Sequence, residues 1–127
     1  MELLSVTSHE RSGWTVLTAV GQLDVATAPG FRQTLQEAQY GGGSHVALEL
    51  SGLEFLDSFG LGVVVGGIKR ARTHDGELAV VCPTGRIRHV FEVTGVDRLV
   101  RMVPELADLD GLQNADARPG DGTAAAD

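Results

Sequence analysis

The chain has 127 residues, of which 43% are hydrophobic and 21% charged, and its formal net charge is −7. This length suits one domain with a single core. The acidic balance argues against nucleic acid or a membrane surface as a partner, because both are bound through basic patches. A partner protein with a basic surface is a better expectation than nucleic acid or a membrane. No apolar run is long enough to span a bilayer. The start, MELLSVTSHE, has neither a basic end nor an apolar signal core, so we expect a cytoplasmic protein.

Cys82 is the only cysteine, and it lies in the apolar run ELAVVCP. A single thiol excludes an internal disulfide and fits a reducing compartment. Its surroundings predict a buried structural thiol rather than a nucleophile.

The first part of the chain predicts a hairpin, a helix and a buried strand. The runs LLSVTS and WTVLTAVG alternate, are rich in β-branched residues and flank the turn formers HERSG, which indicates strands at 2–8 and 14–20. TAPGFRQTLQEAQY predicts an amphipathic helix over 27–39, capped by Thr27 and ended by GGG. The strand at 46–50 has too little polarity for an exposed face, so we expect it to be central.

The second part predicts three more helices and two more strands. They are a helix from Ser58 to THDG, a strand at 77–82, a short helix in PTGRIRHVFEVTG, a strand in RLVRMV and a helix from Pro104. The order β-β-α-β-α-β-α-β-α indicates an α/β fold, a mixed sheet of four to five strands faced by about four helices. We expect the domain to occupy 1–112 and a small, polar, acidic segment at 113–127 to be a disordered tail.

The stretch EFLDSFGLG, residues 54–62, places Asp57 and Ser58 where a strand ends and a helix begins. Capping of the helix could by itself justify either residue. A helix N-terminus also carries partial positive charge and free N–H groups that suit a phosphate. A phosphoryl group on a serine there would add a charge of about −1.5 to −2 at neutral pH without harming the fold.

The helix that follows is expected to have two apolar faces. At about 100° per residue, Leu61, Val64, Val65 and Ile68 share the face expected to meet the sheet. The opposite face is expected to carry Phe59, Gly62, Val63 and Gly66.

The same helix contains four glycines: Gly60, Gly62, Gly66 and Gly67. Each costs roughly 1 kcal/mol against alanine. Close approach of another surface would offset that cost, either from the same chain or from a partner. A bare face beside a modifiable serine favours a partner.

Asp24, in GQLDVATAP, follows the second predicted strand and precedes the first predicted helix. It has two open interpretations. One is a turn or capping role. The other places it beside Ser58, because both residues follow a strand and precede a helix, and such loops gather at one end of an α/β sheet.

Motifs for enzymatic chemistry are incomplete. A nucleophile elbow needs glycine two places before the serine, where Leu56 stands. A P-loop needs lysine directly after its second glycine, but in GVVVGGIK Ile68 stands there. GLGVVV lacks the third glycine of a dinucleotide-binding fingerprint. The four histidines lack metal-ligand spacing. We therefore expect no enzyme activity, no cofactor and no metal.

Three segments, GQLDVATAPGFRQTL, VALELSGLEFLDSFGLGVVVGGIKRAR and LAVVCPTGRIRHVFEVTGVDRLV, resemble the STAS domain of bacterial anti-sigma factor antagonists. The resemblance covers roughly residues 10–112 and rests on Asp-Ser, a variable residue and Gly-Leu after a strand, with G-x-L-D upstream. It implies that Ser58 is phosphorylated by an anti-sigma factor that is also a serine kinase. Asp24, Asp57 and Gly60 would surround it.

The same resemblance implies a partner-switching cycle. The unphosphorylated antagonist would bind the anti-sigma factor and release a sigma factor, and a PP2C-type phosphatase would reset the switch. The helix from Ser58 would form part of the partner surface. The family usually has Ser or Thr where this chain has Phe59, a large side chain that bears on which anti-sigma factor fits. The alternative is a STAS module without phosphorylation, serving as a scaffold in a larger signalling or transport assembly.

Overall fold

The computed structural model describes residues 3–42 and 44–115. The elements in chain order are β1 (Leu4–Arg11), β2 (Trp14–Leu23), α1 (Ala28–Tyr40), β3 (His45–Glu49), β4 (Leu53–Leu56), α2 (Ser58–Thr73), β5 (Glu77–Val81), α3 (Arg86–Thr94), a 3-10 turn η1 (Val96–Arg98), β6 (Arg101–Val103) and α4 (Asp108–Ala115). The expected order of strands and helices is confirmed, with β4 as an addition. This strand was not predicted because LEFL is short and follows a Ser-Gly break.

The six strands form one mixed sheet in the order β1-β2-β3-β5-β6, and β4 pairs with β2 beside the main path. β1 and β2 are antiparallel and the other pairs are parallel. β3 lies in the middle, as its apolar sequence predicts. The hairpin turn needs only Ser12 and Gly13, which have φ of 51° and 86°. Two positive φ angles match the right-handed twist of the flanking strands, so the strands extend to Arg11 and Trp14.

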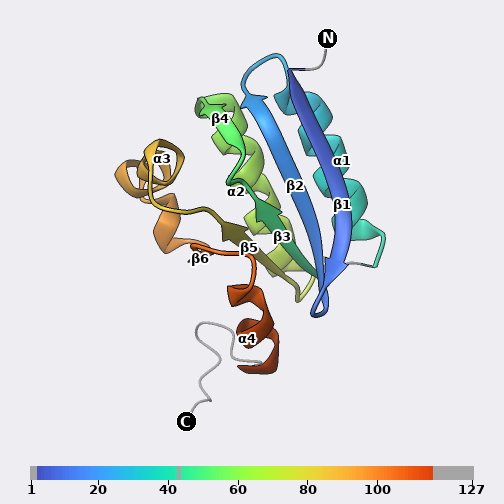
Figure 1. The fold of residues 1–127 in the computed structure, drawn as a ribbon. Coiled ribbons are helices and arrows are strands. Elements are labelled where there is room, and N and C mark those ends of the chain that lie inside the picture. The colour runs from blue at the N-terminus through green and yellow to red at the C-terminus, as the bar shows by residue number, and fades with distance from the viewer. Residues whose placement is uncertain (1–2, 43, 116–127) are drawn as a thin grey trace.

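Helices cover the two faces of the sheet unequally. α1 and α2 lie side by side behind the sheet (Figure 1), and the larger core cluster joins Phe31 and Leu35 of α1 and Val64 of α2 to strand residues such as Leu48. The second cluster lies on the opposite face, where α4 covers one end of the sheet with Leu109. Side chains point alternately to the two faces along a strand, so successive residues of a strand belong to different core clusters.

The end of the domain lies slightly beyond the predicted boundary. α4 continues to Ala115, so residues 113–115 are helical although the sequence places them in a tail. Positions 116–127 lie outside the described residues, and the disordered tail stays a prediction.

Candidate functional site

Two strand-to-helix loops lie next to each other at one end of the sheet. β2 and β4 are parallel neighbours with Leu23 opposite Leu56, and each strand runs directly into a loop that precedes a helix. The N–H of Asp57 donates to the carbonyl of Leu23 at 3.2 Å. The structure therefore brings the Asp24 loop and the Asp57–Ser58 junction together, as their shared position after a strand predicts.

Asp57 is the N-cap of α2, and its carboxylate joins the two loops. One carboxylate oxygen accepts the N–H groups of Phe59 and Gly60, each at 3.0 Å. The other accepts the N–H of Val25 at 3.1 Å, from the loop after β2. Two of the first-turn amides that the sequence suggested were free for a phosphate, those of Phe59 and Gly60, are thus bound by Asp57. The carboxylate satisfies orphan amides of the helix and fixes the neighbouring loop.

Ser58 is the first residue of α2, and its side chain is exposed. Within the described part of the chain, no hydrogen bond is formed by its hydroxyl group. The hydroxyl is therefore reachable from solvent, at the positive end of a sixteen-residue helix. This is the geometry that an acceptor of a transferred group requires.

Asp24 serves the turn that enters α1. One of its carboxylate oxygens accepts the N–H groups of Ala26 at 3.0 Å and Thr27 at 3.1 Å. The Thr27 hydroxyl donates to the carbonyl of Gln22 and accepts the N–H of Asp24. Thr27 is the N-cap residue of α1, as the sequence predicts, but its side chain forms no capping hydrogen bond, since its hydroxyl bonds back into the loop. The turn interpretation of Asp24 holds, and it fixes the loop beside Asp57.

The four glycines of α2 fall into two pairs. A Cβ on Gly60 would lie 2.6 Å from Cγ of Leu23, and one on Gly67 would lie 2.6 Å from Cδ2 of Leu35. These two glycines let the helix approach the β2 loop and α1. Among the described residues, a Cβ on Gly62 would meet nothing within 4 Å, and one on Gly66 would meet only Arg70, at 3.5 Å. The chain itself therefore explains two of the four.

Val63 does not lie on the open face of α2. Only 3% of it is exposed, so its assignment to the partner surface is wrong. The buried arc of the helix is about 160° wide at 100° per residue, and it is centred near Ala71 rather than on the predicted sheet face. The reason is a second neighbour: α1 packs against α2, with Gln39 donating to the carbonyl of Gly67 at 2.9 Å.

The open face combines an aromatic ring with bare backbone. Phe59 is 60% exposed, Gly62 is exposed and Gly66 is half-buried. Val25, which the sequence analysis did not single out, is 57% exposed. The backbone N–H groups of Val25 and Phe59 bind the two oxygens of Asp57, so both apolar residues are held near Ser58. The sequence feature that could have identified Val25 as a site residue is its position as a β-branched residue inside a polar turn.

Three other features would point to a different function: a metal site, a membrane-spanning helix and a reactive thiol. Over residues 3–42 and 44–115, no three His, Cys, Asp or Glu side chains gather closely enough to hold a metal ion. Over the same residues, no helix has the length and apolarity needed to cross a bilayer. Cys82 is 2% exposed, and burial raises the pKa of its thiol, so the prediction of a structural thiol is confirmed.

Known proteins are similar to this chain in fold and in sequence. The model of the STAS domain family matches residues 5–109. The anti-sigma-B factor antagonist of Listeria monocytogenes is 31% identical over 94 residues, which are 74% of this chain and 79% of that protein. An anti-sigma factor antagonist from Mycobacterium paratuberculosis has a similar crystal structure, with a TM-score of 0.80 and 23% identity over 87% of this chain and 94% of that one.

A Bacillus cell fate determinant, SpoIIAA, solved in its phosphorylated form, has a TM-score of 0.66 and 21% identity over 85% of this chain and 99% of that one. Identities at this level show the fold, whereas the family match and the Listeria relative show membership. The chain therefore belongs to the STAS domain family, among the anti-sigma factor antagonists, which are non-enzymatic regulators.

Proposed function

We propose that this chain is a phosphorylation-controlled antagonist that acts in the cytoplasm. Its unphosphorylated form binds an anti-sigma factor with serine-kinase activity and so releases a sigma factor. Phosphorylation of Ser58 blocks that binding, and a PP2C-type phosphatase restores it. The observation that carries the proposal is the exposed Ser58 hydroxyl at the start of α2, beside a helix face that the chain leaves open.

The contacts of Asp57 explain how a phosphate would act as a switch. In the transfer, Ser58 Oγ bonds to the γ-phosphorus of ATP, the bond to the bridging oxygen breaks, ADP leaves and the hydroxyl proton passes to a base of the kinase. The amides of Phe59 and Gly60 are already bound to Asp57. The new dianion therefore stays at the surface near a carboxylate. Covering it with a partner would require desolvation of the charge, which is costly without a cation to pair it.

The open face of α2 suits close contact with a partner. Phe59 and Val25 offer two exposed apolar side chains next to Ser58, and apolar anchors near the centre of an interface carry much of its affinity. Gly62 and Gly66 let the partner's surface approach the helix backbone. The partner-binding set proposed here is Phe59, Gly62 and Gly66 with Val25 added, and Val63 is omitted because it is buried.

The test compares three serine variants by calorimetric titration with an anti-sigma factor from the same host, identified by pull-down on the dephosphorylated protein. Ser58→Ala should bind like the unphosphorylated wild type, and Ser58→Asp should bind at least about tenfold more weakly. Ser5→Asp adds the same charge to an exposed position on β1 and should have no effect. Equal binding of Ser58→Asp and Ser58→Ala would refute the switch. Mass spectrometry after incubation with the anti-sigma factor and ATP should place one phosphate on Ser58.

A further inference from the structure

α4 covers an apolar part of the sheet, on the face opposite α2. Beneath it lie Trp14, Val16, Ala47, Ala79 and Val81, from three strands, all buried. Leu109 of α4 is fully buried against them, and Leu106 and Leu112 are partly buried on either side. Leu109 and Leu112 of α4, together with Leu106 just before it, therefore hold a helix of eight residues on this face.

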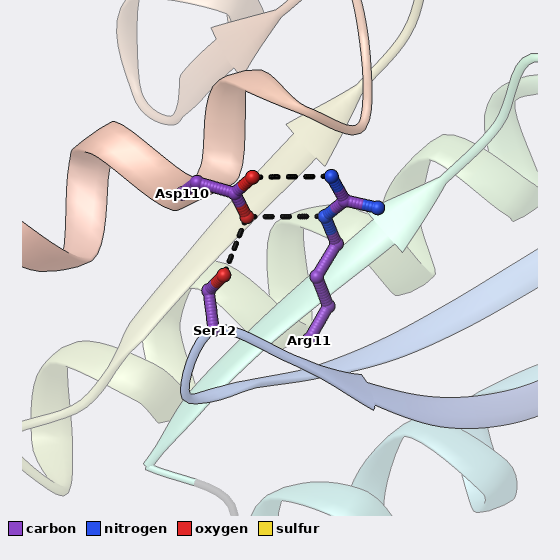
Figure 2. A network of polar contacts seen from close by, with 3 residues as sticks. All are labelled: Arg11, Ser12 and Asp110. Carbon is purple, nitrogen blue, oxygen red and sulfur yellow. Dashed lines mark hydrogen bonds and ion pairs between the residues drawn. The ribbon is translucent and has the colours of Figure 1, made fainter.

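A polar cluster fastens the same helix to the tip of the β1–β2 hairpin. Figure 2 shows Asp110 of α4 facing Arg11 and Ser12. The guanidinium of Arg11 donates from Nε and Nη2 to the two oxygens of Asp110, each at 3.1 Å. The hydroxyl of Ser12 donates to one of those oxygens. A bidentate pair of this kind fixes orientation as well as distance.

The cluster depends on Ser12 remaining a donor. A carboxylate only accepts hydrogen bonds, so Ser12 can contact Asp110 only through its O–H. The hydrogen bonds from Arg11 and Ser12 lower the pKa of Asp110, because they stabilise the charged carboxylate. Ser12 is exposed and lies at the tip of a two-residue turn, where an enzyme can reach it.

We propose that Arg11, Ser12 and Asp110 form a latch for α4 and that Ser12 is a second phosphoacceptor whose modification opens the latch. The family match ends at residue 109, so Asp110 lies just past the shared domain. The latch is independent of the proposed role of Ser58, because it lies on the other face of the sheet.

Phosphorylation would weaken both contacts that Asp110 makes in the cluster. Ser12 Oγ bonds to the γ-phosphorus of a nucleoside triphosphate supplied by a serine kinase, the diphosphate leaves, and the hydroxyl proton goes to the kinase's base. The product has three acceptor oxygens and a charge of about −1.5 to −2. It can no longer donate to Asp110, it repels that carboxylate, and it competes for Arg11. α4 is then held by its leucines alone.

The experiment uses the full chain with phosphoserine installed at position 12 by amber suppression. Hydrogen exchange should rise at least about threefold in the amides of 109–112 while those of β3 stay protected. Trp14, beneath α4, should shift its fluorescence toward the red. Phosphoserine installed at Ser8 is the matched control, since Ser8 is an exposed β1 residue paired with Leu17. It should change neither signal.

Two further arms make the proposal refutable. In an Asp110→Asn background the phosphate no longer faces a carboxylate, so the added exchange should largely disappear. Unchanged exchange in 109–112, a loss of protection in β3 as well, or an effect that persists in Asp110→Asn would each overturn the latch. For the acceptor role, Ser58→Ala protein purified from the natural host should carry a phosphate on Ser12. Its absence under all growth phases would overturn that role without bearing on Ser58.

Discussion

Alanine substitutions at Gly60 and Gly62 separate packing from binding within one helix turn. Gly62→Ala places a methyl group in open space, since a Cβ there meets nothing within 4 Å. Alanine costs the backbone less entropy in a helix than glycine does, so we expect the free energy of unfolding to rise by about 0.5–1 kcal/mol.

Gly60→Ala should act in the opposite direction. Its Cβ would lie 2.6 Å from Cγ of Leu23 and 2.7 Å from the carbonyl oxygen of the same residue. A backbone oxygen cannot rotate away, so α2 or the β2 loop must shift. Such overpacking costs about 1–3 kcal/mol, which the gain in helix propensity of about 1 kcal/mol offsets in part. We expect a net loss of up to about 2 kcal/mol.

Urea denaturation of both variants at 25 °C measures the difference. The midpoints should move in opposite directions with an unchanged slope, because the surface exposed on unfolding is the same. If Gly62→Ala gains stability but binds the anti-sigma factor more weakly, the open face of α2 is a partner surface. Equal stability of Gly60→Ala and Gly62→Ala would refute the packing argument, and full binding by Gly62→Ala would refute the partner argument.

Two further predictions concern the N-cap and the corrected helix face. Asp57→Ala should lower the free energy of unfolding by about 2 kcal/mol, because two helix amides and the amide of Val25 lose their acceptor. Asp57→Asn should lose about half of that, and Glu54→Ala, an exposed acid nearby, less than about 0.5 kcal/mol by thermal or urea unfolding. Val63→Ala should cost about 2 kcal/mol of stability through a cavity and leave binding by the folded protein intact. Phe59→Ala should show the reverse, with binding lost and stability changed by less than about 0.5 kcal/mol; equal profiles for these two variants would contradict the assignment of faces.

Local sequence patterns predicted most of the elements because each signal is contained in a few neighbouring residues. Alternation identified β1 and β2, and Gly41 and Gly95 marked the ends of α1 and α3, whereas α4 begins at Asp108 and not at the predicted Pro104. β4 escaped because four residues after a Ser-Gly break carry little periodic signal, and its pairing with β2 depends on residues some thirty positions away. For the same reason the sequence could not predict the hydrogen bond from the N–H of Val25 to Asp57, through which the N-cap of α2 also holds the loop after β2.

The position of α2 on the helical wheel shows what periodicity cannot supply. The sequence identifies an apolar helix, and a single covering surface would place its buried face along Leu61, Val64 and Ile68. The helix instead contacts both the sheet and α1, so the buried arc widens toward Gly67 and includes Val63. Which residues a second neighbour buries depends on where that neighbour packs, and the apolar periodicity of α2 does not record the position of α1.

The glycine spacing did contain part of that information. Gly60 and Gly67 are seven residues apart and share one face, while Gly62 and Gly66 are four apart and share another. Two pairs on different faces imply two close approaches, and the structure accounts for one of them through Leu23 and Leu35. The second pair keeps its cost of roughly 2 kcal/mol against alanine with no compensating contact among the residues that the structure describes. A surface outside the chain that needs the bare backbone of Gly62 and Gly66 would supply that compensation, and it would do so one to two turns from the hydroxyl of Ser58.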